Sequence, residues 1–254
     1  MKKLHLPFLL ALAMMFFASC SRNSYSIMSY NVRNCKGLDN VTNIPRIAEI
    51  ITRHTPDFVA LQELDSMTTR YNQKYVLEEI ANAVAMNYIY APAINYDGGK
   101  YGIGLLSKEK AISAIQIPLP GTEESRTLLL VEFEKLYVCC THFSLTPADQ
   151  LESVKVLRDF FAHIEKKTYS KKPIILAGDI NATPDSETQK MMLKYFKNLS
   201  GTQPTFPANA PDRCIDYIYY FNPIQNNAVS SKNKQVIEES VASDHRPVMI
   251  QIKF

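Results

Sequence analysis

Apolar positions along the chain follow two periods, of which the shorter, typical of strands, dominates. Short apolar or β-branched runs that stop at turn residues or charges predict strands. These strands are expected over residues 26–31, 58–62, 88–90, 103–107, 111–117, 127–133, 136–141, 174–177, 215–221 and 247–254. Many strands beside a few long helices favour a layered α/β sandwich over a wound βαβ sheet.

Apolar residues three or four positions apart predict the helices. One stripe contains Ile47, Ile50 and Ile51 and stops before Pro56, since the residue preceding a proline disfavours helical geometry. The other inward stripes are Val76, Leu77, Ile80 and Val84, then Leu151, Val154, Leu157, Phe161 and Ile164, with a last helix over residues 186–197. Residues 97–100 predict a hairpin turn and not a phosphate cradle, because no helix follows them.

The amino terminus has the layout of a secretory signal peptide. Lys2 and Lys3 precede an apolar run over residues 4–17, and two small residues then stand before Cys20. The run is too short to span a bilayer as a helix, which needs about 20 apolar residues. Small residues before a cysteine resemble the bacterial lipobox. Phe17 stands where that motif usually has leucine, so a plain cleaved signal is the alternative.

This terminus sets the expected domain division and location. We expect a lipoprotein signal peptide over residues 1–19, a lipidated tether over 20–24 with the lipid on Cys20, and a single domain over 25–254. The protein would then be exported and anchored by lipid to a membrane of a bacterial cell envelope, on the periplasmic side or at the cell surface. No obligate protein partner is expected.

Composition and charge narrow the class of protein. With 46% hydrophobic and 21% charged residues, the chain is an ordinary globular domain that can bury a large core. Its formal charge of +3 includes Lys2 and Lys3, so removal of the signal leaves 3 − 2 = +1. This balance is not typical of polyanion-binding proteins, and net charge therefore does not indicate a nucleic-acid substrate.

Apart from Cys20, the chain has Cys35, Cys139, Cys140 and Cys214. No zinc spacing is present among them. Cys139 and Cys140 are adjacent in a predicted strand, so they point to opposite faces and cannot hold one metal together. We expect buried free thiols, although export to an oxidising compartment leaves a disulfide open.

Several predicted strands stop abruptly at a carboxylate, an amide or an imidazole. Asn31, Glu63, His142 and Asp179 stand at or just after the ends of apolar runs. The set is completed by Asn181, Asp216, Asp244 and His245. Hard oxygen ligands without clustered cysteines favour Mg²⁺, Mn²⁺ or Ca²⁺ over zinc. Such an ion suits phosphate chemistry, in which it neutralises phosphoryl charge.

Seven short blocks resemble, in order, the signature blocks of the endonuclease/exonuclease/phosphatase family. They are MSYNVR at 28–33, LQE at 61–63, YGIGLLSK at 101–108, THF at 141–143, GDINATP at 178–184, IDYI at 215–218 and SDHRPV at 243–248. Each block alone is weak evidence, but seven in the family's order are not expected by chance. The resemblance implies a four-layered α/β sandwich, in which helices flank two packed mixed β-sheets.

The resemblance also implies roles for single residues. The metal ligands would be Glu63, Asn31 and Asp244, with Mg²⁺ or Mn²⁺ as the cofactor. Asp179 would position the attacking water. The other catalytic residues would be Asn181, His142, His245 and Asp216. Asn181 would hold a phosphate oxygen or the leaving group, and the two histidines would stabilise or protonate the transition state. Asp216 would orient His245. Arg126, together with Asn181, would bind the substrate phosphate.

The implied function is metal-dependent hydrolysis of phosphate esters, most simply of a phosphodiester by an endonuclease-like mechanism. His142 stands where abasic-site nucleases have a tyrosine, which makes the chain similar to deoxyribonuclease-like and sphingomyelinase-like members. Nucleic acid, phospholipid head groups and sugar phosphates all remain candidate substrates. A phospholipid head-group or sugar-phosphate phosphatase is therefore the alternative enzyme.

A catalytically silent binding lipoprotein on the same fold is the competing class of function. It predicts gaps among the metal and imidazole positions, and the sequence shows none. Taken singly, the polar residues also have ordinary structural explanations: Asn31 can end a strand, Asp179 and Asn181 can shape a turn, and Glu63 can form a surface ion pair.

Overall fold

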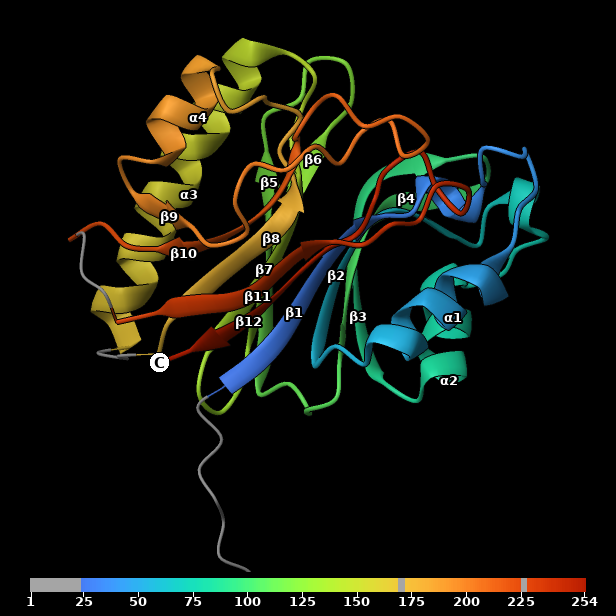
Figure 1. The fold of residues 1–254 in the computed structure, drawn as a ribbon, viewed down its shortest axis with the longest axis horizontal. Helices are drawn as coiled ribbons and strands as arrows, with labels where there is room; N and C mark the ends of the chain where they lie inside the picture. The colour runs from blue at the N-terminus through green and yellow to red at the C-terminus, as the bar shows by residue number, and fades with distance from the viewer. Residues whose placement is uncertain (1–23, 169–171, 225–227) are drawn as a thin grey trace, which may run out of the picture.

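Two six-stranded sheets form the centre of the molecule (Figure 1). The computed structural model describes residues 24–168, 172–224 and 228–254. The first sheet has the order β11 (Ser230–Val236), β12 (Val248–Lys253), β1 (Ser24–Asn31), β2 (Phe58–Ser66), β4 (Gly99–Ser107) and β3 (Asn87–Tyr96). The second has the order β5 (Ser113–Leu119), β6 (Arg126–Glu132), β7 (Tyr137–His142), β8 (Ile174–Asp179), β10 (Asp216–Phe221) and β9 (Phe196–Asn198).

Each sheet is mixed, with one parallel pair at its middle. β1 and β2 are parallel in the first sheet and β7 and β8 in the second, whereas the remaining neighbours are antiparallel. The carboxyl ends of both parallel pairs lie at the same edge of the sandwich, at the top of Figure 1. Four strands therefore bring their last residues toward one place.

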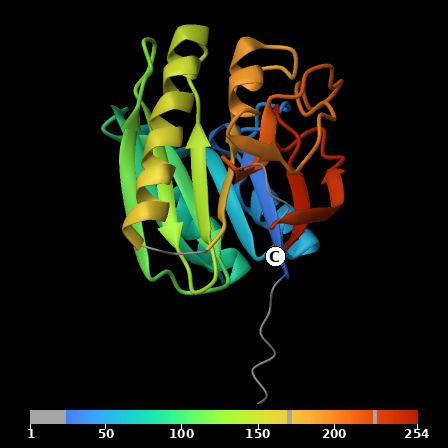
Figure 2. The same cartoon turned by 90° about the vertical axis from the view of Figure 1, so that its left-hand side faces the viewer.

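Helices cover the outer face of each sheet, which gives the four predicted layers. The first sheet carries α1 (Ile44–His54) and α2 (Val76–Val84), and the second carries α3 (Pro147–Thr168) and α4 (Glu187–Met192), seen face-on in Figure 2. Two short 3₁₀ helices, η1 (Arg33–Cys35) and η2 (Thr69–Tyr71), follow β1 and β2. The predicted α/β sandwich of two packed mixed sheets is confirmed.

The core is layered in the same way. Between the sheets, Phe58 packs against Phe133 with ring centroids 4.7 Å apart. Outside the second sheet, Leu157 and Phe161 of α3 are fully buried, as their helical spacing predicts. Each such side chain contributes about 1.5–3 kcal/mol on burial, so these layers stabilise the packing of the sheets on each other and of α3 on the second sheet.

The four cysteines among the described residues are buried and free. Cys140 lies in the core between the sheets, whereas Cys139 faces α3. The expectation that the adjacent pair points to opposite faces is confirmed. Burial raises the pKa of all four thiols, which makes them inert structural groups.

Two sequence predictions need correction. The helix expected over residues 186–197 ends at Met192, and the chain turns into β9 at Phe196. Phe196 is buried against aromatic residues of α3 and β10, a tertiary contact that outweighs local helical preference. β11 was not predicted, because its mostly exposed, polar sequence SSKNKQV lacks an apolar alternation.

The predicted hairpin at residues 97–100 is confirmed. Tyr96 pairs with Gly99, and the two intervening residues, Asp97 and Gly98, both have positive φ values of 44° and 78°. Both features are typical of a two-residue hairpin turn.

The predicted signal peptide over residues 1–19 and the predicted lipidation site Cys20 lie outside the described residues. Over residues 24–168, 172–224 and 228–254, no helix combines the length and the apolar content needed to cross a membrane.

Candidate active site

The two sheets are joined at the ends of their parallel strands. Asn31 is the last residue of β1 and Asp179 the last of β8. The Asn31 amide Nδ2 donates to Asp179 Oδ2 over 3.1 Å, across a sequence separation of 148 residues. Both side chains are about 1% exposed, so this contact fixes the two halves of the site relative to each other.

Glu63 lies next to Asn31 and is held by two neutral donors. Asn31 Nδ2 donates to Glu63 Oε1 at 2.9 Å, and the Tyr101 hydroxyl donates to Oε2 at 2.8 Å. Within the described part of the chain, no basic side chain pairs with this carboxylate. A partly buried anion without a basic partner is a suitable place for a cation.

A β-bulge aims the Glu63 side chain. The register of β2 against β4 shifts between Leu61 and Leu64, and Glu63 has a φ of 61°. We expected Glu63 to follow the end of its strand, whereas β2 continues to Ser66. The local irregularity lies inside the strand instead. A positive φ at a residue with a side chain costs about 1 kcal/mol or more, which is a common feature of functional sites.

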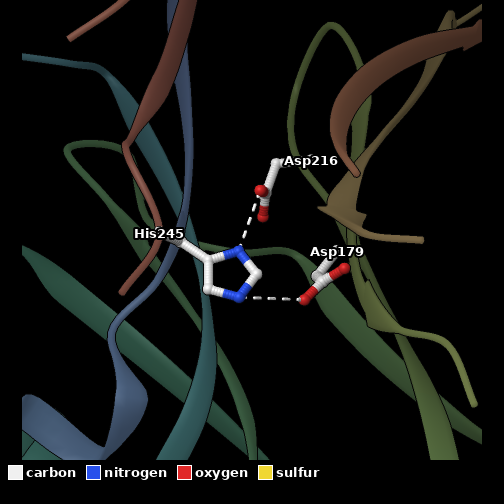
Figure 3. Close-up of side chains that lie close together, drawn as sticks. All are labelled: Asp179, Asp216 and His245. Carbon is white, nitrogen blue, oxygen red and sulfur yellow. Dashed lines mark hydrogen bonds and ion pairs between the residues drawn. The ribbon is translucent and has the colours of Figure 1, made fainter. Parts of the chain in front are cut away.

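His245 lies between two buried carboxylates (Figure 3). Its Nδ1 is 2.9 Å from Asp216 Oδ2, and its Nε2 is 3.7 Å from Asp179 Oδ2. Asp216 is the first residue of β10 and pairs with Asp179 across the antiparallel ladder, which places both carboxylates at the same edge. Thr205 also donates to Asp216 Oδ2, at 2.6 Å. The expected pairing of Asp216 with His245 is therefore present.

The close contacts among His245, Asp216 and Asp179 shift the pKa values of His245 and Asp179. Burial alone would lower the pKa of His245, but Asp216 and Asp179 outweigh it and raise that pKa to about 10. Burial, with the nearby Asp216 carboxylate, raises the pKa of Asp179 to about 7. At neutral pH, His245 is thus a cation that can donate a proton. The pKa of Asp179 lies near neutral pH, so this carboxyl group can take up or release a proton there.

His142 and Arg126 lie on the side of Asp179 that faces β6 and β7. His142 ends β7 and Arg126 begins β6, so the strand pairing brings them together. Arg126 Nη1 lies 3.2 Å from His142 Nδ1, and His142 Nε2 lies 3.6 Å from Asp179 Oδ2. Burial and the Arg126 charge hold the pKa of His142 well below its usual value. His142 is therefore neutral, and with Nδ1 accepting from Arg126 its Nε2–H points toward Asp179.

Asn181 lies beside Asp179 in a tight turn with a φ of 53°. Its backbone N–H donates to Asp179 Oδ1 at 2.9 Å, and its Nδ2 donates to the Phe143 carbonyl at 3.0 Å. Asparagine tolerates this left-handed conformation better than most residues. The turn thus holds Asp179 and presents an amide group at the same edge.

Asp244 is only partly gathered into the site. Ser243, the preceding residue, donates from Oγ to the Asn31 carbonyl at 2.7 Å and so docks this loop on the end of β1. The Asp244 carboxylate pairs with Arg33 Nε at 3.5 Å and is 27% exposed. Asp244 therefore lies in a loop that is docked on Asn31, and its carboxylate is directed to Arg33.

Two groups could hold a metal ion. Asp179, Asp216 and His245 have ligand atoms within 4.8 Å of one another. Their arrangement is already explained by a charged imidazole between two carboxylates, so we favour Glu63 with Asn31. The Asn31 amide turns its nitrogen to the carboxylates, and its Oδ1 accepts from the Arg33 N–H at 3.0 Å. Glu63 fits a hard cation directly, and Asn31 would have to rotate its amide to add an oxygen.

Three contributors were not predicted from the sequence. Tyr101 opens one of the recognised blocks, but nothing in the pattern indicates its bond to Glu63. Thr205 lies in an irregular segment without periodicity, and its link to Asp216 depends on the tertiary fold. Glu124 pairs with Arg126 at 3.2 Å, and only the Glu-x-Arg spacing could have indicated it.

The chain is similar in sequence or in fold to several known proteins. The Danio rerio protein tyrosyl-DNA phosphodiesterase 2 is 29% identical over 161 residues, which cover 61% of this chain; the match spans 41% of that protein's length. Among solved structures, an endonuclease/exonuclease/phosphatase from Beutenbergia cavernae superposes with a TM-score of 0.75 at 21% identity, over 92% of this chain and 72% of the other. A mannosyl-6-phosphatase from Bacteroides thetaiotaomicron superposes with a TM-score of 0.69 at 18% identity, over 91% of this chain and 100% of the other.

The structural likenesses support the fold alone, since the identities are low. The sequence model of the endonuclease/exonuclease/phosphatase family matches residues 28–245, a span that contains every predicted site residue except Cys20. A match over most of the length establishes membership. The chain belongs to the endonuclease/exonuclease/phosphatase family.

Proposed function

We propose that this chain is a divalent-metal-dependent hydrolase that cleaves phosphate esters, with phosphodiesters as its main substrates. The observation that carries the proposal is the position of Asp179. It is buried, its pKa is raised to about 7, and it lies between the Asn31 amide and the imidazoles of His142 and His245. A carboxylate in these surroundings is suited to take a proton from a water molecule.

Different side chains would bind the phosphate and handle protons. The Arg126 guanidinium supplies a fixed positive fork for two phosphate oxygens. One Asn181 amide hydrogen is used by Phe143, and the second is the donor that we propose for a phosphate oxygen. His142, held neutral, would donate a hydrogen bond from Nε2, and His245, held charged by Asp216, would provide the proton for the leaving oxygen.

The residues proposed to hold the ion are Glu63, Asn31 and Asp244, with Glu63 as the main ligand because its charge has no basic partner among the described side chains. A Mg²⁺ or Mn²⁺ ion there would neutralise charge on the phosphoryl oxygens and the leaving group.

Two likenesses favour different substrates. The Danio rerio relative is named a phosphodiesterase, and its sequence match is the observation that favours phosphodiesters. The alternative is a phospholipid head-group or sugar-phosphate phosphatase, which the structural likeness to a mannosyl-6-phosphatase favours. Since that likeness is one of fold, it ranks second.

The substrate class is tested by a parallel panel. Purified protein is assayed with Mg²⁺, with Mn²⁺ and with EDTA against bis-p-nitrophenyl phosphate, p-nitrophenyl phosphate, mannose 6-phosphate, plasmid DNA and phospholipid vesicles. We expect turnover that EDTA abolishes, highest on bis-p-nitrophenyl phosphate and plasmid DNA. Highest turnover on mannose 6-phosphate or on vesicles would favour the alternative, and inactivity on all five by folded protein would favour a binding lipoprotein.

A matched pair of variants separates the site from the fold. Asp179→Asn should lower kcat by about 10²-fold or more, because it removes the proposed base. Asp185→Asn makes the same change at an exposed turn position and should leave kcat within about twofold. Equal rates for the two variants would refute the assignment of Asp179.

We also propose export and lipid anchoring through Cys20, on the strength of the amino-terminal sequence. Cys20→Ser should abolish incorporation of labelled palmitate and release the protein from the membrane fraction. Unchanged labelling of the variant would overturn the proposal. A wild-type protein that is absent from the membrane fraction would favour a plain cleaved signal.

A further inference from the structure

Arg126, the proposed phosphate ligand, is already paired with carboxylates of its own chain. Nη1 lies 3.2 Å from Glu124 Oε1, and Nη2 lies 3.6 Å from Glu123 Oε1. The arginine side chain is only 8% exposed. One guanidinium therefore faces two carboxylates, and the immediate surroundings of the phosphate-binding group are not positive.

The two glutamates are held differently. Glu123 accepts hydrogen bonds from the Ser144 hydroxyl, the Leu145 backbone N–H and the Thr146 hydroxyl, which fix it to the loop after β7. Glu124 has one partner among the described residues, the Arg126 guanidinium. Glu123 is thus a fixed part of the loop, and Glu124 can leave Arg126 without breaking another bond.

Glu124 also faces the reaction site. It lines a narrow cleft with Tyr101, Arg126 and His142, all of which contact proposed catalytic or metal-binding groups. Burial in this cleft, with the charges of Glu63 and Glu123 nearby, raises the pKa of Glu124, although Arg126 opposes the shift. A phosphate oxygen that takes the place of Glu124 at Arg126 Nη1 would displace the Glu124 carboxylate and lie next to it.

We propose that Glu124 is a specificity-determining residue that disfavours dianionic phosphate monoesters and so selects monoanionic phosphodiesters. The inference rests on the proposed phosphoesterase function. Its basis is the position of one displaceable carboxylate on the Arg126 guanidinium, inside a cleft that His142 and Tyr101, the hydrogen-bond partner of Glu63, also line.

Charge gives the direction of the effect. A phosphate monoester carries about −1.5 to −2 at pH 7, whereas a diester carries a single negative charge. Like charges about 4 Å apart near a protein surface repel strongly enough to change binding by an order of magnitude or more. The second charge of a monoester would meet this repulsion from Glu124, and a diester lacks that charge.

The kinetic test compares kcat/KM for bis-p-nitrophenyl phosphate and p-nitrophenyl phosphate in Glu124→Gln. Both values should rise, because a competitor for Arg126 is removed, and the monoester value should rise about tenfold more. Glu134→Gln is the matched control, since Glu134 is exposed in the turn at the other end of β6. A diester-to-monoester ratio that matches the control, or that moves toward the diester, would overturn the proposal.

A binding test separates this inference from the proposed function. Calorimetric titration with inorganic phosphate and with diethyl phosphate needs no turnover. We expect phosphate to bind Glu124→Gln about tenfold more tightly than wild type, and diethyl phosphate to change less. Equal shifts for both anions, or no phosphate binding to either protein, would contradict the role of Glu124 even if the enzyme is active.

Glu124→Ala, with melting curves for each variant, provides a second test if Glu124→Gln folds poorly. It should shift the same ratio in the same direction. The proposed hydrolase function fails separately, if the wild type turns over neither ester while the anion titrations still distinguish the variants.

Discussion

Asp179 connects the two halves of the candidate active site, because Asn31 reaches it from the first sheet and His245 and His142 from other elements. Its neighbours give each imidazole a different charge state. Asp216 stabilises the cation on His245, while Arg126 disfavours one on His142. Two histidines of equal intrinsic pKa can therefore serve as proton donor and neutral hydrogen-bond donor in one cleft.

The positive charge of His245 should depend on Asp216. Asp216→Asn removes the carboxylate that contributes most to the raised pKa of His245, so this pKa should fall from about 10 toward its ordinary value, although Asp179 still raises it. We expect kcat at pH 7 to fall about 10²-fold. A titration of the His245 ring followed by NMR measures the pKa directly.

Asp212→Asn is the control, because Asp212 is an exposed carboxylate in the same segment, 75% exposed and paired only with Arg213 among the described side chains. It should change neither quantity. An unaltered His245 pKa in Asp216→Asn would show that Asp216 does not hold the charge.

At the scale of elements, the bulge in β2 gives a test of backbone strain. Glu63→Ala and Glu63→Gly both remove the carboxylate and its two hydrogen bonds, so they differ in backbone preference alone. Because Glu63 has a φ of 61°, the glycine variant should be more stable than the alanine variant by about 1 kcal/mol. In an ordinary strand glycine would be the less stable of the two.

Urea unfolding of the two variants measures the difference in free energy of unfolding. Thr127, in regular strand β6, is the matched site at which Thr127→Gly should be less stable than Thr127→Ala. The same order at both sites would contradict a strained backbone at Glu63.

The contribution of Glu123 to the stability of the loop after β7 should depend on pH. Partial burial works to raise the pKa of Glu123, but hydrogen bonds from Ser144, Leu145 and Thr146 outweigh it and lower the pKa to about 2. A lowered folded-state pKa means that the stabilisation is complete above the unfolded value of about 4.5 and is lost as the pH falls through about 2.

Glu123→Gln should therefore be less stable than wild type at pH 7, by about 1 kcal/mol after allowance for the solvent around this side chain. The difference should shrink steadily below about pH 4.5. Urea unfolding at pH 7, 5, 4 and 3 tests the trend, and a difference that is constant over this range would mean that the Glu123 charge is not what stabilises the loop.

Elements with a strong period were predictable from the sequence, and elements decided by long-range contacts were not. The stripe of α3 and the run of β8 follow directly from apolar spacing, as does the place of Asp179 at the end of β8. β9 and the bulge at Glu63 depend on residues distant in the chain, which a local pattern does not contain.

At the scale of the whole molecule, the sandwich assembles the site from distant segments. Ser243 contacts Asn31 across 212 positions, and Asn31 contacts Asp179 across 148. Sequence alone indicated which residues belong together, through the ordered family blocks. It did not indicate Glu124, Tyr101 or Thr205, because their roles come from side chains that meet only after the sheets pack.

We propose that a cation bound at Glu63 supports phosphate-ester hydrolysis. The most direct measurement is the initial rate of bis-p-nitrophenyl phosphate hydrolysis against free Mg²⁺, for wild type, Glu63→Gln and the exposed control Glu152→Gln. We predict no rate in EDTA, saturable recovery with Mg²⁺ for wild type and control, and at least a ~10-fold higher Mg²⁺ requirement for Glu63→Gln. A rate that EDTA does not affect, or the same Mg²⁺ dependence in all three proteins, would contradict the claim.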